Sequence, residues 1–310
     1  MSIPEKCKHY IQNTSIGDQI TQWQLLRHWS LSEVYRIKLA SGGSRIIKWG
    51  GSEMAREADV YIQLLAPLHI RVPHLYDHWS NTSGGLILIE DAGTYDLEKQ
   101  PESELFLEAA RELARLRVSS IKHLELGAVP LHVRQKYDIS AQAFIDQLFE
   151  LQTYDDFQYN PSLEWAANTF PTKVKELYAC MPYALVHHDY FPKNLIVQHN
   201  RILVIDWSNA YLSPHLGDLH GLIQEAQSRS GVSRDHMLHA YTHELQQGGS
   251  NYACSHISID EQVDLGGLCW YIRTLHWLIH RGKDIIPGSI EWIPPLLDDL
   301  SLLVQRMQLK

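Results

Sequence analysis

The chain up to residue 92 carries short apolar runs that are separated by turns. Residues 23–29, 34–39 and 44–49 have the length and composition of β-strands, and a Ser-Gly-Gly turn at 41–43 separates the last two. A further apolar run at 86–89 follows two glycines and leads into Glu-Asp-Ala-Gly. This pattern predicts a β-sheet that ends in a flexible connection to the rest of the chain.

Helical spacing of apolar residues appears at residues 53–65 and prevails again from Ser103, a predicted N-cap, onward. The predicted helices cover residues 103–116, 139–152 and 161–179 and most of 219–310. In the last region, the apolar stripe of Leu268, Ile272, Leu275 and Ile279 is joined by Trp270 and Trp277 on the other side of the helix. Since a helix that is apolar all round is usually buried, Arg273 and His276 are interpreted as polar residues of the core.

A hairpin pattern between these helical regions carries the strongest chemical signal. His187, Asp189 and Asn194 precede an apolar run at 195–197, and after a polar turn a second apolar run ends at Asp206. Two short β-type runs joined by a turn predict a hairpin. Its geometry places Asn194 just before one strand and Asp206 at the end of the next, so both side chains can face one point.

This arrangement suits phosphoryl transfer from ATP, which needs metal ions on the phosphates and a carboxylate for the proton of the attacking hydroxyl. Asp189 is the candidate base, and His187 is expected to brace the loop. Asn194 and Asp206 offer the oxygen ligands that Mg²⁺ prefers. An acidic loop beside a buried hairpin is the alternative, which the ordered spacing of the whole set disfavours.

The same residues resemble the catalytic loop of the aminoglycoside phosphotransferase and choline kinase group, the small-molecule branch of the protein-kinase-like fold. That group typically has His-Gly-Asp, then four residues, then Asn, then strands closing on Ile-Asp-Trp. This chain has His188 in place of the glycine and Ser208 where a glutamate often follows the tryptophan. Neither departure removes a metal ligand or the base.

The resemblance assigns further residues to the nucleotide. Lys48, at the end of a β run, would contact the α- and β-phosphates and pair with a helix glutamate, Glu57, with Glu53 as the fallback. A strand-edge lysine and a solvated helix face are the alternatives. The phosphate-covering turn would use the hydroxyls of Ser30 and Ser32, because no glycine-rich loop is present.

Two more assignments follow from position in the resembled fold. Backbone groups of the connection from Glu90 to Ala92 would hydrogen-bond the adenine edge. Asp218 would tie its carboxylate back to the catalytic loop, with a plain helix N-cap as the alternative.

Composition limits the remaining choices. The 310 residues are 45% apolar, enough for one large domain or two lobes, and the net charge of −9 argues against a nucleic-acid partner. No run of 18 apolar residues and no signal-like apolar start occurs, so we expect no membrane partner and a cytoplasmic location. The scattered Cys7, Cys180, Cys254 and Cys269 are expected to be reduced thiols.

Other polar groups leave alternatives open. His236, His239 and His243 share a helical face, so a zinc site is a secondary hypothesis. Acidic residues that could grip a cationic acceptor, or merely form a solvated face, are Glu225, Asp235, Asp260, Glu261 and Asp264.

The sequence therefore predicts an α+β, two-lobed kinase-like fold, with a nucleotide-covering lobe at 1–92 and a mainly helical lobe at 93–310. The predicted function is ATP- and Mg²⁺-dependent transfer of the γ-phosphoryl group to a hydroxyl of a small molecule, as in aminoglycoside phosphotransferases. A metabolite kinase acting on choline, an amino-sugar or another alcohol is the alternative within enzymes. A nucleotide-binding regulator with little transfer activity is the alternative from another class. A protein kinase is disfavoured, because no Asp-Phe-Gly or Ala-Pro-Glu pair is evident.

Overall fold

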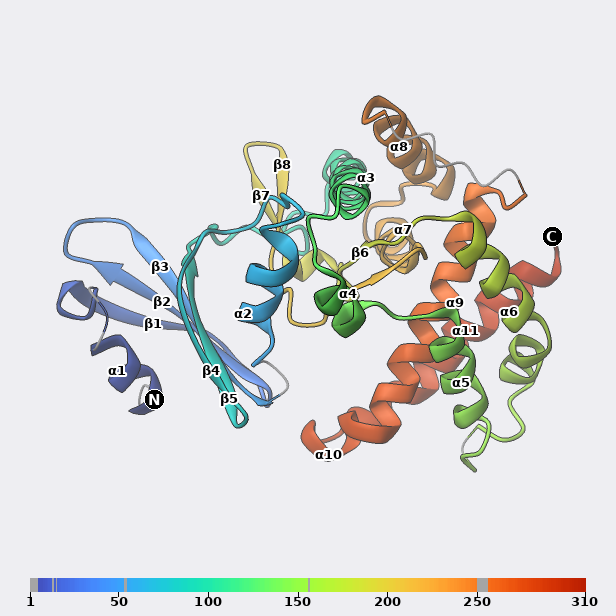
Figure 1. Ribbon diagram of the computed structural model, residues 1–310, viewed down its shortest axis with the longest axis horizontal. Helices are drawn as coiled ribbons and strands as arrows, with labels where there is room; N and C mark the ends of the chain where they lie inside the picture. The colour runs from blue at the N-terminus through green and yellow to red at the C-terminus, as the bar shows by residue number, and fades with distance from the viewer. Residues whose placement is uncertain (1–4, 13, 15, 53–54, 156, 250–255) are drawn as a thin grey trace.

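The computed structural model describes residues 5–12, 14, 16–52, 55–155, 157–249 and 256–310, which form a sheet-bearing lobe and a larger helical lobe (Figure 1). The sheet is antiparallel, with strand order β1-β2-β3-β5-β4. Its strands are β1 (Ile20–His28), β2 (Ser32–Leu39), β3 (Ser44–Gly51), β4 (Leu75–Asn81) and β5 (Gly84–Glu90). The expected sheet is present, and β4 is a strand that the apolar pattern did not reveal.

Helices cover both faces of this sheet (Figure 1). Because side chains alternate along a strand, Leu86 and Leu88 of β5 pack toward α1 (Glu5–Gln12), while Ile87 and Ile89 pack on the opposite side. There they join one cluster with α2 (Glu57–Val60) and its continuation as a π-helical turn, η3 (Tyr61–Leu65). The sheet is thereby fixed between two helical layers.

The turn between β2 and β3 depends on glycine. Gly42 and Gly43 have φ of 88° and 80°, a region that side-chain-bearing residues rarely adopt. The turn sets the register of β3, so that Lys48 lies opposite Val34 on one side and Ile87 on the other. Lys48 is therefore held in a central strand and not at a frayed edge.

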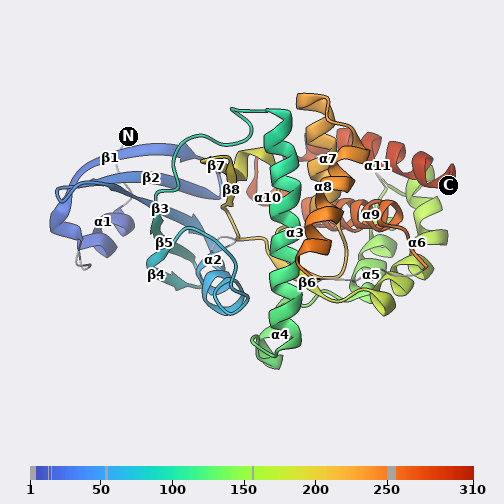
Figure 2. The same cartoon turned by 90° about the horizontal axis from the view of Figure 1, so that it is seen from above.

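The second lobe is mainly helical, and its longest helix, α3, stands between the sheet-bearing lobe and the other helices (Figure 2). Three of the predicted helices correspond closely to α3, α5 and α6. Ser103, the predicted N-cap of α3, is its first helical residue, since Glu102 occupies the cap. The helices of this lobe are α3 (Ser103–Glu125), α4 (Leu131–Tyr137), α5 (Ala141–Leu151), α6 (Pro161–Cys180), α7 (Gly217–Ser230), α8 (Arg234–Gln247), α9 (Ile259–Trp277), η5 (Leu278–Gly282), α10 (Lys283–Ile285) and α11 (Ile293–Gln308).

Short strands carry the catalytic-loop sequence into this lobe. The predicted hairpin consists of β7 (Leu195–Gln198) and β8 (Arg201–Val204), while β6 (Ala184–Val186) pairs with β9 (Tyr211–Ser213). The hairpin turn at residues 199–200 has positive φ at both positions, as in a type I′ turn. One 3₁₀ turn, η4 (Pro192–Asn194), leads directly into β7.

The chain that joins the lobes is bonded to this hairpin. The N–H of Leu97 donates to the carbonyl of Leu195 at 2.8 Å, and the N–H of Val197 donates to the carbonyl of Tyr95 at 2.8 Å. The Nε2 of Gln198 donates to the carbonyl of Ala92 at 2.9 Å. The connection thus runs alongside β7 and forms one wall of the space between the lobes.

The cysteines correct one expectation. Cys7 and Cys269 are free and buried, as expected of reduced thiols, but Cys180 is disulfide-bonded, and Cys254 lies outside the described residues. Among the described helices, none has both the length and the apolar content needed to cross a membrane.

Candidate active site

A buried lysine links the two lobes. The Nζ of Lys48 lies 2.6 Å from the Oε2 of Glu57 on α2 and 2.6 Å from the Oδ1 of Asp206, which follows β8. Lys48 is 8% exposed and Glu57 is 2% exposed, so the contacts form largely away from water. The structure therefore brings together the strand lysine and Glu57, the preferred helix acid; the fallback, Glu53, lies outside the described residues.

The three charges of this group do not cancel. Burial opposes the charge of Lys48, but the Asp206 and Glu57 carboxylates outweigh it and raise the pKa of the ammonium group. Burial also opposes the charge of Asp206, yet Lys48 holds the pKa of that carboxyl well below its usual range. For Glu57, burial prevails over Lys48 and raises the pKa. With all three ionised, the group has a net charge of −1, which favours binding of a further cation.

The backbone at Asp206 aims its carboxylate at Lys48. Asp206 has φ of 66°, an uncommon conformation that aspartate tolerates better than most residues. The next residue, Trp207, is buried and donates its N–H to the Oε1 of Glu57 at 3.3 Å. The hydroxyl of Ser208 donates to Asp206 Oδ1 at 3.2 Å, so the residue that replaces the usual glutamate supports the metal candidate directly.

The loop before η4 is held by its own histidine. The ring of His187 donates from Nε2 to the carbonyl of Ile205 at 3.0 Å and accepts the N–H of Asp189 at Nδ1, at 3.2 Å. One ring nitrogen donates and the other accepts, which is the hydrogen-bonding pattern of a neutral imidazole. His187 thus connects the loop to β8, in line with the expected bracing role.

Asp189 and Asn194 are mutually oriented. The Nδ2 of Asn194 donates to both the backbone carbonyl and the Oδ2 of Asp189, each at 2.9 Å. Lys193 lies 3.2 Å from the same Oδ2. The Oδ1 of Asn194 accepts no hydrogen bond from the described residues and is left for a ligand.

Asp218, in the first turn of α7, anchors the loop from below. Its carboxylate accepts the N–H of His187 at 2.7 Å and the N–H of His188 at 2.8 Å. Burial raises the pKa of Asp218 although the two N–H bonds act in the opposite direction. Leu216 occupies the N-cap of α7, so the structure contradicts the alternative in which Asp218 is a simple helix cap.

His188 occupies a position that requires left-handed backbone, with φ of 70°. Glycine suits this conformation, which explains why the resembled group has glycine here. The backbone carbonyl of His188 accepts the indole N–H of Trp270 at 2.8 Å. Burial, then the nearby Arg273, lower the pKa of His188 well below its usual value, so the ring is neutral.

A cavity of about 290 Å³ lies between the lobes beside Lys48. Ser32, Glu90 and Ala92 belong to its wall, whereas Ser30 is exposed at the β1–β2 turn and is not part of it. The N–H of Ala92 makes no hydrogen bond within the described part of the chain. The wall also includes Lys48, Glu57, Asp96, Lys193, Asn194, Asp206 and the apolar side chains of Leu26, Val34, Ile46, Pro73, Ile89, Ile196 and Ile205.

A second cavity, of about 400 Å³, opens on the other side of Asp206 and contains Asp189. Its wall corrects the interpretation of α9, because Arg273 and His276 face this space instead of the core, while Leu268, Ile272, Leu275 and Ile279 are buried as predicted. The sequence did contain a signal, since Trp270, Arg273 and Trp277 recur on one face of the helix opposite that apolar stripe. The wall further includes Arg27, Trp29, Leu31, Ser32, Arg56, Gln147, His188, Lys193, Ser208, Asn209, Thr274, His280, Arg281 and Trp292.

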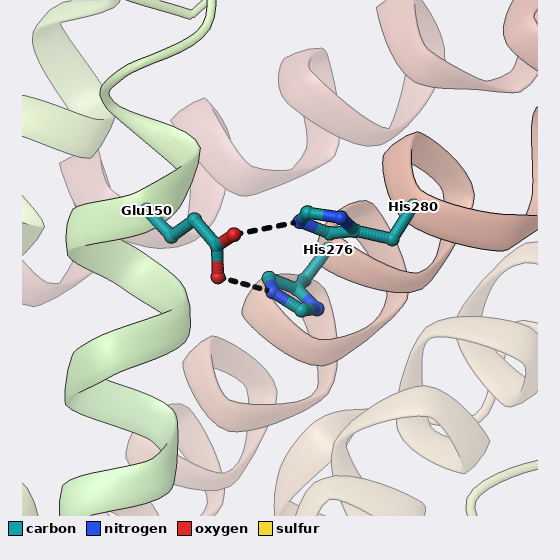
Figure 3. Close-up of side chains that lie close together, drawn as sticks. All are labelled: Glu150, His276 and His280. Atoms are coloured by element: carbon teal, nitrogen blue, oxygen red, sulfur yellow. Dashed lines mark hydrogen bonds and ion pairs between the residues drawn. The ribbon is translucent and has the colours of Figure 1, made fainter.

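Two histidines of this wall hold a glutamate from α5 (Figure 3). The Nε2 atoms of His276 and His280 lie 2.9 Å and 3.2 Å from the two carboxylate oxygens of Glu150. Their ligand atoms lie within 4.8 Å of one another. The sequence pattern missed this group because Glu150 is remote from the histidines along the chain.

The other candidates lie away from both cavities. Among the described residues, His236, His239 and His243 do not form a cluster close enough to share a metal ion, although they line one surface hollow on α8. Asp264 is fully buried and is paired with Arg234, which corrects its interpretation as a solvated acid. Three other acids are paired with cations: Asp260 with Arg234, Glu261 with Lys173 and Glu225 with Arg229.

The two lobes, the buried Lys48–Glu57 pair and the loop that leads to Asp206 define a kinase-like protein. A family model described as the phosphotransferase enzyme family matches residues 31–252. The chain belongs to the phosphotransferase enzyme family. The predicted resemblance and enzyme class, a phosphotransferase acting on a hydroxyl of a small molecule, are thereby confirmed.

Solved structures agree in fold. A thermostable mutant of the aminoglycoside phosphotransferase APH(4)-Ia, in a ternary complex with AMP-PNP and hygromycin B, has a TM-score of 0.64 at 14% identity, with 96% of this chain and 97% of that chain covered. Amicoumacin kinase in complex with AMP-PNP, Ca²⁺ and Ami gives 0.59 at 13% identity, covering 96% and 93%. Plasmodium vivax ethanolamine kinase gives 0.61 at 15%, covering 96% and 90%. At these identities the likeness establishes the two-lobed α+β kinase-like fold alone. A search of the curated proteins finds no match.

Proposed function

We propose that this protein transfers the γ-phosphoryl group of ATP to a hydroxyl of a small molecule bound in the 400 Å³ cavity. The observation that carries the proposal is the position of Asp206, whose carboxylate contacts Lys48 and borders both cavities. Nucleotide and acceptor would meet at this carboxylate. Residues 1–92 would cover the nucleotide and residues 93–310 would supply the catalytic loop and the acceptor site.

The residues present fit a divalent cation. Asn194 and Asp206 border the same cavity and offer oxygen ligands, and contact with Lys48 favours the ionised form of Asp206. Mg²⁺ prefers such oxygen ligands and binds through few protein groups together with phosphates. When bound, Mg²⁺ would neutralise charge on the phosphates, and Asn194 and Asp206 would hold it. The amicoumacin kinase complex, which contains AMP-PNP and Ca²⁺, supports the binding of a nucleotide and a divalent ion by a protein of this fold.

The protein's own groups have distinct tasks in this proposal. Lys48, oriented by Glu57, would bind the α- and β-phosphates. Backbone groups of Glu90 and Ala92 would contact adenine, and Ser32, with Ser30 at the turn, would cover the phosphates.

Asp189 would accept the proton of the attacking hydroxyl. The bond from that oxygen to the γ-phosphorus forms while the bond from the γ-phosphorus to the β,γ-bridging oxygen breaks, releasing ADP. His187 and Asp218 would hold Asp189 in place through the loop contacts described above. The need for ATP supports a cytoplasmic site of action. The disulfide of Cys180 counts against it, because disulfides are rare in cytoplasmic proteins.

Substitution Asp189→Asn tests the proposed base. The change keeps the side-chain volume, and Asp189 borders only the acceptor cavity. We expect turnover to fall on the order of 10²-fold or more, the scale of a positioned acid–base group, with Mg·ATP affinity preserved within a few fold. Calorimetric titration with Mg·ATP and an ADP-release assay measure the two quantities. A large loss of nucleotide affinity with turnover intact at saturation would refute the assignment.

The competing functions are separated by the same assay. Aminoglycosides, choline, ethanolamine and further alcohols are tested as acceptors, since the fold presents the same centre to each. A nucleotide-binding regulator would bind Mg·ATP and release no ADP with any acceptor.

A further inference from the structure

The acceptor cavity has an unusual charge for a site that would bind cationic acceptors. Its wall contains the cations Arg27, Lys193 and Arg273, and its two described acids, Asp189 and Asp206, already have other roles in the proposed function. Aminoglycosides carry several positive charges, and a site for them needs acidic groups to offset repulsion by cations of the wall. In the described residues, the wall offers no acid beyond the proposed base and the proposed metal ligand.

The nucleotide accounts for only part of this positive charge. Arg27, Lys193 and Asp206 border both cavities and can serve the phosphates of ATP. Arg273 borders the acceptor cavity and not the nucleotide cavity.

Arg273 is the most informative of these cations. It is half-buried on α9, and no carboxylate within the described part of the chain pairs with its guanidinium, whose Cζ lies 4.7 Å from the ring centroid of Tyr211. A partly desolvated charge without a counter-ion is costly unless a ligand supplies one. The neighbouring His188 is neutral, so it neither competes for an anion nor repels a cation.

Glu150, a glutamate beside this cavity, does not offset the charge inside it. Figure 3 shows both carboxylate oxygens of Glu150 turned to the Nε2 atoms of His276 and His280. The imidazoles belong to the cavity wall, whereas Glu150 does not. Its side chain is 48% exposed, so water screens its charge further.

Indole rings provide the apolar part of the wall. Trp270 and Trp277 lie on the same helix as Arg273, and Trp29 and Trp292 complete the set. Trp270 is fixed by its bond to the His188 carbonyl, next to Asp189. A flat, apolar body could therefore stack beside the base while an anionic group reaches Arg273.

From these contacts we propose that the acceptor is an anionic alcohol, with a carboxylate or phosphate group that Arg273 binds and an apolar or aromatic body. This inference rests on the proposed function, because it assumes that the cavity beside Asp189 is the acceptor site. The guanidinium matches both anions by paired hydrogen bonds, so they share one recognition chemistry.

Four matched probes test the charge preference: 4-(hydroxymethyl)benzoate, 4-(hydroxymethyl)phenyl phosphate, the neutral 1,4-benzenedimethanol and the cationic 4-(hydroxymethyl)benzylamine. Binding is measured by calorimetry in the presence of Mg·ADP, so that no turnover is needed. We expect the anionic probes to bind about tenfold more tightly than the amine, the scale of one charge-assisted hydrogen bond. The carboxylate and phosphate arms show which anion fits better.

Arg273→Gln should abolish this preference, and Arg273→Lys should keep part of it. Arg201→Gln, at an exposed position on β8, is the control for net charge and should bind like the wild type. Urea unfolding checks that each variant is folded. Tighter binding of the amine, lack of binding of both anions, or a preference that persists in Arg273→Gln would overturn the inference. Failure of Mg·ATP to bind would instead contradict the proposed function.

Discussion

Asp218→Asn tests how far the catalytic loop depends on one buried carboxylate. The carboxylate accepts two backbone N–H groups, from His187 and His188, at 2.7 Å and 2.8 Å. An asparagine of the same shape has one acceptor oxygen, and its NH₂ group faces the second N–H. The substitution thus removes one charge-assisted bond and leaves two donors opposed in a buried site.

The structure sets the size of the effect. A hydrogen bond to a charged group contributes about 1.5–3 kcal/mol, and an unsatisfied buried N–H costs about 1–3 kcal/mol. Removing the charge offsets part of this loss of stability, because burial disfavours ionisation of Asp218 and raises its pKa. We therefore expect the free energy of unfolding to fall by about 2 kcal/mol. Turnover should fall on the order of 10²-fold, as expected when a reacting group shifts by about 1 Å.

Urea unfolding and ADP release measure the two losses, and calorimetry should show Mg·ATP affinity within a few fold of the wild type, since Lys48 and Asp206 are untouched. The control is Asp235→Asn, which replaces an exposed aspartate in the first turn of α8. It likewise removes one negative charge from the N-terminal turn of a helix, but makes no contact with the catalytic loop. If both variants behave alike, Asp218 has no special anchoring role. Lower stability with normal turnover would show that Asp218 supports the fold without positioning Asp189.

Two further predictions concern buried charge. Asp206→Ala should abolish turnover with an unchanged thermal unfolding profile, because Lys48 remains paired with Glu57; turnover at the wild-type level would refute the metal assignment. Burial and nearby arginines lower the pKa of His215 to about 3 and that of His220 to about 4. Below pH 6.5 the unfolded chain therefore binds more protons than the folded chain. The free energy of unfolding should decrease as the pH is lowered from 6.5 to about 4. His220→Gln should reduce the pH dependence of the free energy of unfolding by about 1.4 kcal/mol per pH unit, as measured by urea unfolding. The control His236→Gln, at an exposed position, should leave it unchanged. Equal pH dependence in both variants would contradict this account.

The elements that the sequence predicted well are those specified by local pattern. The β2–β3 hairpin follows from a Gly-Gly turn that only glycine favours, and the β7–β8 hairpin follows from two short apolar runs. The ordered spacing from His187 to Asp206 was informative because loop and hairpin are contiguous, so local geometry brings their ends together. β4 was missed because all of its residues are partly or fully exposed, as expected of an edge strand with little apolar signal.

The acceptor cavity was not predictable in the same way. Its wall combines β1, β2, α5, α9 and η5, and nothing in the local sequence indicates that these elements converge. Arg273 was assigned to the core because the helix has tryptophans on its second face, and those tryptophans line the cavity instead. Glu150 and the histidines it contacts, about 126 positions apart along the chain, likewise meet only through packing of α5 against α9 and η5.

The bonds between the interlobe connection and β7 have a mechanical consequence. Residues 95–97 are bonded to the hairpin, and Arg36 of β2 pairs with Asp91 just beyond β5, so each end of the connection moves with its own lobe. A change in the angle between the lobes would then fall on residues 92–94, where Gly93 has φ of 109°, and would have to break or bend the Gln198–Ala92 and Arg36–Gly93 hydrogen bonds. Nucleotide entry and ADP release would share this short pivot. Its stiffness, and not the chemistry beside Asp206, would then set the pace of the catalytic cycle whenever product release is the slow step.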